Sequence, residues 1–241
     1  MNRSEKISNW IKQKVEAAGA KGCILGLSGG IDSAVVALLC KKVFPQNTLA
    51  LILPCHSLAV DIDHAKEFAQ RIDLKIKEID LSTSFDSLFG VFEGKPYSGQ
   101  KDLSIANIKP RLRMTTLYYF ASQLNYLVIG TGNRSELEMG YFTKYGDGGV
   151  DLLPLGNLLK KDVRALAQEL GVTKEIIDKA PSAGLWAGQT DESEMGITYD
   201  ELDQFLSGND KGIAKDKIEL IRKRQAASEH KRTLPEIFGL Q

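Results

Sequence analysis

Short apolar runs alternate with stretches of helical periodicity along the first half of this chain, and this alternation limits the possible folds more than any other feature. The runs that predict buried strands are 23–27, 48–53, 75–79 and 126–130. The stretches that predict helices are 4–18, 32–43, 60–72 and 108–124. Strands separated by helices indicate βαβ units and a parallel sheet. We therefore predict an α/β fold, in which a doubly wound, mostly parallel sheet of Rossmann-like type is flanked by helices.

The length of 241 residues suits one large domain with its own core and is short for two fused enzymes. No internal repeat or low-complexity tract divides the chain, and the stretch 198–230 also reads as helical. We predict a single domain over 1–241. Turn-rich segments at 90–99, 141–154 and 181–196 have the length of lids or binding loops, although mobile surface connections are the alternative.

Composition argues against several kinds of partner. Lys plus Arg and Asp plus Glu each number 31, so the formal net charge is zero and gives no support for bulk nucleic-acid binding. No apolar stretch approaches the length of a membrane-spanning helix, and the polar start lacks the pattern of a signal peptide. The three cysteines lie in or beside apolar runs without a Cys-x-x-Cys pair, which indicates a reducing compartment. We predict a cytoplasmic protein that binds neither nucleic acid nor membrane.

The first chemical motif is Leu-Ser-Gly-Gly-Ile-Asp-Ser at 27–33, between a predicted buried strand and a predicted helix. Small residues let backbone N–H groups approach a phosphate, and the start of a helix adds a favourable dipole. The motif is neither a Walker A loop, because no Gly-Lys-Ser/Thr follows, nor a Gly-x-Gly-x-x-Gly fingerprint. A carboxylate beside phosphates needs a cation between them, so Asp32 is interpreted as a Mg²⁺ ligand. The alternative is a turn in which Asp32 and Ser33 cap the helix.

Ser28 to Ser33 resembles the Ser-Gly-Gly-x-Asp-Ser loop of the N-type ATP pyrophosphatases, whose fold is the adenine nucleotide alpha-hydrolase type. The run 140–155, Gly-Tyr-Phe-Thr-Lys-Tyr-Gly-Asp-Gly-Gly-Val-Asp-Leu-Leu-Pro-Leu, is similar to the signature of one branch, the ammonia-dependent NAD synthetase family. The segments 107–114, 130–136 and 230–232 match the same family. The resemblance extends from Gly26 to Lys231, nearly the whole chain.

This resemblance implies the ATP-dependent amidation of deamido-NAD to NAD with ammonia, with release of AMP and pyrophosphate. Ammonia cannot displace oxide from a carboxylate, whereas an adenylated nicotinate carboxylate carries AMP as a stable leaving group. The barrier is then lowered mainly by alignment and charge neutralisation. A glutamine-hydrolysing enzyme needs a second domain, so free ammonia, or ammonia from a separate protein, is the expected donor.

The resemblance also implies roles for individual residues. Asp32, Glu136 and Lys160 are the implied catalytic group, with Asp32 and Glu136 as Mg²⁺ ligands. The implied ATP contacts are Gly26, Leu27, Ser28, Gly29, Gly30, Ile31, Asp32, Ser33, Thr131, Lys160 and Ser182. The implied deamido-NAD contacts are Arg111, Lys144, Asp151, His230 and Lys231. The family site is completed across a homodimer interface, with Lys144 coming from the partner subunit. Ser182 and Gly184 replace the Thr and Asp of many relatives; Ser182 keeps the hydroxyl, but the acid at 184 is lost.

Each assignment has a simpler alternative. By spacing alone, Lys144 and Lys160 are more typical of solvated charges, and Asp147 and Asp151 of turn caps. Glu136 has the position of a residue that stabilises a helix dipole. The cluster at 61–64 (Asp61, Asp63 and His64) is interpreted as capping and surface residues rather than a metal site. The pair at 55–56 (Cys55 and His56) lacks a third group to orient the histidine, which disfavours a cysteine nucleophile.

Two other functions are compatible with the phosphate loop. A tRNA-thiolating relative would carry a catalytic cysteine pair and a basic surface, and neither is evident in this sequence. A regulator that holds ATP without chemistry would not need both Asp32 and Glu136. Release of pyrophosphate separates the enzyme from the regulator.

Overall fold

The computed structural model describes residues 1–182, 184, 186 and 188–239. Its sheet has four strands, β1 (Gly22–Gly26), β2 (Thr48–Ile52), β3 (Lys75–Glu78) and β4 (Tyr126–Val128). The spatial order is β3-β2-β1-β4, and every neighbouring pair is parallel. The predicted α/β class is confirmed, and each strand lies within one or two residues of its predicted range at either end.

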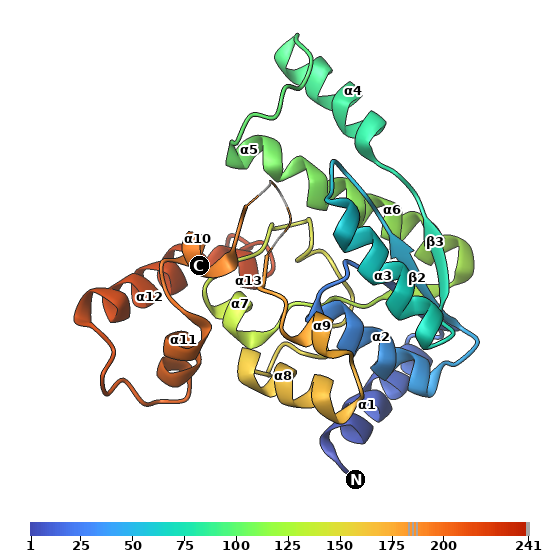
Figure 1. The fold of residues 1–241 in the computed structure, drawn as a ribbon, viewed down its shortest axis with the longest axis horizontal. Coiled ribbons are helices and arrows are strands. Elements are labelled where there is room, and N and C mark those ends of the chain that lie inside the picture. The colour runs from blue at the N-terminus through green and yellow to red at the C-terminus, as the bar shows by residue number, and fades with distance from the viewer. Residues whose placement is uncertain (183, 185, 187, 240–241) are drawn as a thin grey trace.

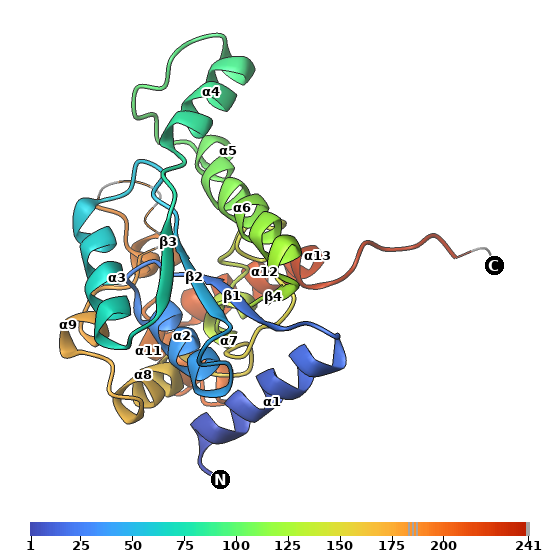
Figure 2. The same cartoon turned by 90° about the vertical axis from the view of Figure 1, so that its right-hand side faces the viewer.

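Helices cover both faces of the sheet, and Figures 1 and 2 show them around it. Their bounds are α1 (Arg3–Ala17), α2 (Ile31–Val43), α3 (Ala59–Arg71), α4 (Ser82–Glu93), α5 (Leu103–Ala106), α6 (Ile108–Leu124), α7 (Arg134–Glu138), α8 (Lys160–Glu169), α9 (Lys174–Ile177), α10 (Asp191–Met195), α11 (Tyr199–Leu206), α12 (Lys215–Ala227) and α13 (Glu229–Arg232). Side chains alternate along a strand, so Cys23 and Leu25 of β1 pack into the core under α1, α2, α3 and α8, whereas Ile24 packs under α4 and α6.

The strand order alone indicates where a ligand would bind. From β1 the chain builds outward through β2 to β3, and it then returns to place β4 on the other side of β1. Connections from β1 and β4 therefore leave the sheet in opposite directions and open a crevice at their carboxyl ends. The loop at 27–33 follows β1, and Thr131 follows β4.

Two helical regions differ from the sequence prediction. The segment 82–93 is helix α4, and the turn predicted to start at 90 begins only after the left-handed cap Gly94. The stretch 198–230, predicted as helical, is divided into α11, α12 and α13, and the turn between α11 and α12 contains Gly208 and Gly212 with φ of 83° and 84°. Glycine adopts such positive φ values without the steric cost that other residues incur, so the break is encoded locally.

The C-terminal helices form a third, smaller core beside the sheet. Met139, Met195, Tyr199, Leu202 and Ile221 are buried in it, and they join α7 to α10, α11 and α12. Beyond α13 the chain extends away from the body, as Figure 2 shows. No helix within the described residues is both long and apolar enough to cross a membrane.

Candidate active site

A cavity of about 1450 Å³ opens at the carboxyl ends of the strands. Its floor is formed by residues that follow β1, β2 and β4, among them Leu27, Leu53 and Thr131. Drug-sized ligands occupy pockets of roughly 300–1,000 Å³. This cavity is larger, so it has room for more than one such molecule.

The phosphate loop is held open by its own hydroxyl groups. Ser33 Oγ donates to the Gly30 carbonyl over 2.9 Å and lies 3.1 Å from Ser28 Oγ. Gly30 is the N-cap of α2, and no side chain accepts a hydrogen bond from the first turn of this helix. The alternative in which Asp32 and Ser33 cap the helix is therefore wrong. The N–H groups at the start of α2 are directed at the crevice, as an anion site requires.

Asp32, Glu136 and Lys160 meet at the base of the cavity, although they come from α2, α7 and α8. Lys160 Nζ lies 2.5 Å from Asp32 Oδ2 and 3.5 Å from Glu136 Oε1. The lysine side chain is only 1% exposed, which rules out the solvated-charge alternative for it. Asp32, which is 128 positions from Lys160, thus forms one charged cluster with Lys160 and Glu136.

The charges within this cluster shift the pKa values of Glu136 and Lys160. Burial and the negative charge of Asp32 raise the pKa of Glu136 to about 8, and the Lys160 ammonium opposes this shift. Burial lowers the pKa of Lys160, but the charges of Asp32 and Glu136 outweigh burial and raise it above its usual value. Lys160 therefore stays protonated, and the two carboxylates together favour a cation.

The donor set fits a hard divalent cation. Asn133 holds one oxygen of each carboxylate: its Nδ2 donates to Asp32 Oδ1 over 3.0 Å, and its N–H donates to Glu136 Oε2 over 3.2 Å. The second oxygens both face Lys160 Nζ, so they converge on one cationic position. No group of three metal-ligating side chains occurs within the described part of the chain. Two carboxylates suffice for Mg²⁺, which usually keeps waters and binds phosphate oxygens.

A local motif at the start of α7 fixes the side chains of Glu136 and Asn133. Asn133 is the N-cap of α7 and accepts from the Glu136 N–H, while the Glu136 side chain accepts from the Asn133 N–H. This capping box fixes the first turn of α7. The helix-stabilising alternative for Glu136 is therefore correct as a structural role, and it coexists with the contact between Glu136 and Lys160.

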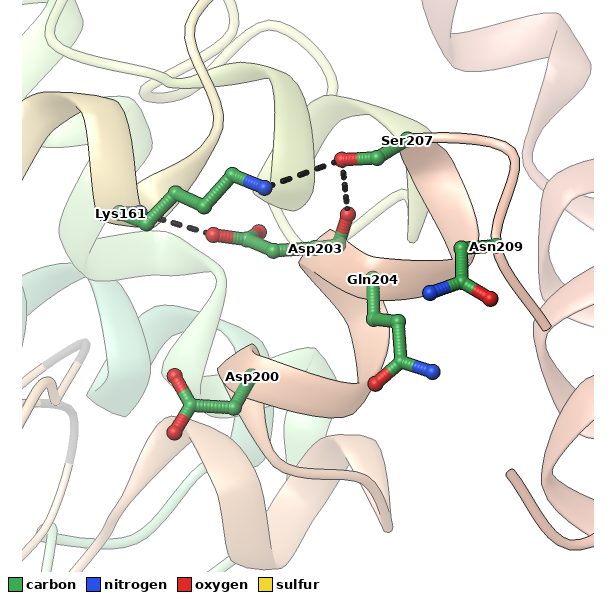
Figure 3. A pocket seen from close by; sticks show the side chains of 6 residues that line it. All are labelled: Lys161, Asp200, Asp203, Gln204, Ser207 and Asn209. Atoms are coloured by element: carbon green, nitrogen blue, oxygen red, sulfur yellow. Dashed lines mark hydrogen bonds between the residues drawn. The ribbon is translucent and has the colours of Figure 1, made fainter. Parts of the chain in front are cut away.

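Asp203 of α11 is a functional residue that the sequence did not identify. It is 2% exposed, and it accepts from Ser135 Oγ over 2.5 Å and from the Lys161 N–H over 2.8 Å. Ser135 Oγ in turn accepts from the Lys160 N–H over 3.1 Å. Figure 3 shows the dashed bond from Lys161 to Asp203, whereas none reaches Asp200 on the same helix. Asp203 thus ties α7 and α8 together behind Glu136 and Lys160.

We expect Asp203→Asn to lower the free energy of unfolding by about 1–3 kcal/mol and to slow ATP cleavage. The amide keeps one acceptor but turns an N–H₂ toward one of two buried donors, which leaves that donor unsatisfied. Asp200→Asn is the matched control, because Asp200 is 91% exposed and its nearest basic group, Arg164, is 3.9 Å away. Urea unfolding and pyrophosphate release would be measured on both variants. Identical behaviour of the two would contradict the role of Asp203.

A second group of basic residues also lines the cavity. Arg111 Nη2 lies 3.5 Å from the Lys144 carbonyl, and Lys144 Nζ donates to the His230 carbonyl. Lys231 Nζ donates to the carbonyls of Gly140 and Phe142 over 2.8 and 2.9 Å. Arg111, Lys144, His230 and Lys231 all line the cavity. One chain alone therefore brings four of the five predicted dinucleotide contacts together.

Asp151 lies apart from this group and does not line the cavity. Its carboxylate accepts from Tyr118 over 2.9 Å and from the Val128 N–H over 2.7 Å, which fixes the end of β4. Of the predicted ATP contacts, Thr131 and Ser182 line the cavity, while Gly29 and Ser33 shape the loop behind it. Gly184 also lines it, and the neighbouring residues 183 and 185 of that segment lie outside the described residues.

The structure corrects the interpretation of the pair at 55–56. A third group does orient the histidine, because His56 Nε2 lies 2.8 Å from Asp86 Oδ1 of α4. Sequence reasoning missed Asp86 because it lies 30 positions from His56 along the chain. The Cys55 thiol is nevertheless buried, and burial raises its pKa, so a cysteine nucleophile remains disfavoured. The predicted capping role of the 61–64 cluster is wrong, because no side chain caps α3, whose N-cap is Leu58, and Asp61 instead pairs with Lys179. Asp63 is a surface residue, as predicted.

Taken together, a parallel sheet, a phosphate loop at its switch point and a partly buried carboxylate pair define a nucleotide-binding α/β protein. The NAD synthase family model matches residues 3–235. The chain belongs to the NAD synthase family.

Relatives support this assignment over nearly the full chain. The NH(3)-dependent NAD(+) synthetase of Carboxydothermus hydrogenoformans is 50% identical over 98% of this chain and 96% of its own length. The corresponding protein of Finegoldia magna is also 50% identical, over 97% of this chain and 94% of its own.

Solved structures show the same fold. An NMN synthetase from Francisella tularensis has a TM-score of 0.92 at 41% identity and covers 99% of this chain and 98% of its own. The NH3-dependent NAD synthetase of Campylobacter jejuni has a TM-score of 0.82 at 31% identity, over 99% of this chain and 100% of its own. A glutamine-dependent NAD+ synthetase from Acinetobacter baumannii, 23% identical with a TM-score of 0.69, shares the fold over 98% of this chain but only 46% of its own.

Proposed function

We propose that this chain is a single-domain, ammonia-dependent NAD synthetase that adenylates the nicotinate carboxylate of deamido-NAD and converts it to the amide. The family to which the chain belongs catalyses this ATP-dependent amidation. The observation that supports the proposal most directly is the cluster of Lys160, Asp32 and Glu136 beside the phosphate loop. That cluster places positive charge, and two ligands for a cation, where the departing pyrophosphate would lie.

The proposed binding mode divides the cavity between the two nucleotides. ATP lies along residues 26–33, with Thr131, Lys160 and Ser182 as further contacts. Asp32 and Glu136 hold Mg²⁺, which neutralises phosphate charge when bound. Arg111, His230 and Lys231, which also line the cavity, bind the deamido-NAD. Asp151 contacts it only if its hydrogen bonds to Tyr118 and Val128 are rearranged.

A homodimer is part of the proposal, with the deamido-NAD site shared across the interface and the Lys144 contact supplied by the partner subunit. The exposed aromatic Tyr145, at 56%, lies directly beside Lys144 and suits an interface position. Ammonia is the proposed nitrogen donor, because the relatives that match nearly the whole chain at 50% identity are NH(3)-dependent NAD(+) synthetases. A cytoplasmic location is proposed from the cysteine usage.

A second acceptor is favoured by the similarity to the NMN synthetase of Francisella tularensis. The same chemistry on the mononucleotide would amidate nicotinate mononucleotide to NMN. The nicotinate carboxylate and its activation are identical in the two reactions. Only contacts to the adenylate half of the dinucleotide distinguish the two acceptors.

The test is an assay with ATP, Mg²⁺ and ammonium, with deamido-NAD and nicotinate mononucleotide supplied in separate reactions. Equal formation of AMP, pyrophosphate and NAD is expected, with glutamine a poor substitute for ammonium. A higher kcat/KM for the mononucleotide would favour the second acceptor and leave the adenylation chemistry in place. Absence of ATP cleavage with either acceptor would contradict both and favour a nucleotide-binding regulator.

A further inference from the structure

Lys179 lies against the phosphate loop from the side opposite Lys160. Its Nζ is 3.5 Å from the Gly29 carbonyl and 2.5 Å from Asp61 Oδ1, and its side chain is 27% exposed. It follows α9 and lines the main cavity together with Ser28, Gly30 and Asp32. The ammonium is therefore held at the edge of the loop, within the same cavity.

Asp61 is fixed by the close packing of α3 on the loop. Gly29 has φ of 76°, and a Cβ at this position would lie 2.4 Å from the Asp61 carbonyl oxygen. Glycine is therefore required at 29 both by conformation and by the approach of α3. This contact places the first turn of α3, and with it the Asp61 carboxylate, directly beside the turn that would surround a phosphate.

The charged side chains near the loop do not balance the negative charge of a bound polyphosphate. Among the described residues of the cavity, the ammonium groups of Lys160 and Lys179 lie near the carboxylates of Asp32, Glu136, Asp61 and Asp191. Lys160 is already shared between two carboxylates and is buried. Lys179 has one carboxylate partner and remains partly exposed, so it is the ammonium that can turn to a new anion.

A phosphate chain is a stronger competitor for this ammonium than a single carboxylate. It carries more negative charge and several acceptor oxygens, and charge-assisted hydrogen bonds to phosphate are strong. A flexible lysine stem lets the group shift by a small rotation without moving the backbone.

We propose that Lys179 binds the pyrophosphate portion of ATP as a second phosphate-binding cation, and that Asp61 holds it beside the loop until the nucleotide arrives. This inference rests on the proposed function for the identity of the ligand. It adds a binding residue on the α3 side of the loop and makes Asp61 the partner that the phosphate displaces.

The test measures binding of inorganic pyrophosphate with Mg²⁺ by calorimetry, and the KM for ATP, in Lys179→Met and Lys179→Arg. Lys179→Met is expected to weaken pyrophosphate binding and raise the KM for ATP by roughly tenfold or more, the range for losing a charged hydrogen bond. Lys179→Arg keeps the charge and is expected to recover most of the affinity. Lys174→Met is the matched control, because Lys174 is exposed and does not line the cavity.

The Asp61→Asn variant tests whether Lys179 binds phosphate or only forms a structural ion pair with Asp61. If Lys179 binds phosphate, freeing it from Asp61 leaves pyrophosphate affinity unchanged or higher. If Asp61→Asn loses affinity as Lys179→Met does, the pair only shapes the loop and the proposal is overturned. Unchanged pyrophosphate binding in Lys179→Met also overturns it. Failure of the wild-type protein to cleave ATP would count against the proposed function, whereas the pyrophosphate titrations judge Lys179 separately.

Discussion

Asp32→Asn is expected to slow pyrophosphate formation by about a hundredfold to a thousandfold, the range seen when one preorganised charge-stabilising group is removed. Asp32 Oδ2 lies 2.5 Å from Lys160 Nζ, and its Oδ1 accepts from Asn133. The amide oxygen can still accept from Asn133, so the shape of the loop is retained. The negative charge that would hold Mg²⁺ and align Lys160 is lost.

The same variant is expected to remain folded, because Asn has nearly the size of Asp and the side chain is 17% exposed. Asp63→Asn is the matched control, since Asp63 is an exposed aspartate of α3 that does not line the cavity. Pyrophosphate release would be followed at several Mg²⁺ concentrations, together with a thermal melt. A normal rate in Asp32→Asn at limiting Mg²⁺ would refute the role of Asp32.

The sequence predicts the parts of this protein that depend on local patterns. Apolar runs bounded by glycine indicated the strands, and the small residues before Asp32 indicated the phosphate loop. Because the strand predicted at 23–27 leads directly into the loop, the loop could be assigned to the ligand-binding edge of a parallel sheet without coordinates. The burial of Lys160 could not be predicted in this way, since its spacing alone is typical of a solvated lysine.

Contacts between distant segments account for what was missed. Asp203 acts through Ser135 and Lys161, and nothing near Asp203 in the sequence signals that partnership. Asp191, only 4% exposed, accepts from Tyr199 over 2.9 Å, and this too depends on how α10 packs on α11. Side-chain networks of this kind are specified by tertiary packing, which a single sequence does not reveal.

Lys160→Met is expected both to abolish measurable ATP cleavage and to lower the free energy of unfolding by about 3 kcal/mol. Removing one partner of a buried ion pair leaves uncompensated charge, which typically costs about 3–5 kcal/mol. We expect the lower end of this energy range because Asp32 and Glu136 remain 17% and 18% exposed. Water therefore offsets part of the lost interaction with the lysine. Methionine fills a similar volume over the Tyr199 ring, where the lysine ammonium lies 5.0 Å from the ring centroid.

The response of the Lys160→Met variant to Mg²⁺ distinguishes the loss of the lysine charge from a simple loss of packing. With the ammonium gone, Asp32 and Glu136 still direct one oxygen each toward the same position, so a divalent cation there would restore the balance of charge. Urea unfolding of Lys160→Met is therefore expected to recover part of the lost stability in millimolar Mg²⁺, while the wild type gains less. Lys161→Met is the control, because Lys161 Nζ contacts only Ser207 at the surface. If Mg²⁺ leaves the stability of Lys160→Met unchanged, the two carboxylates do not form a cation site, and the magnesium assignment fails with them.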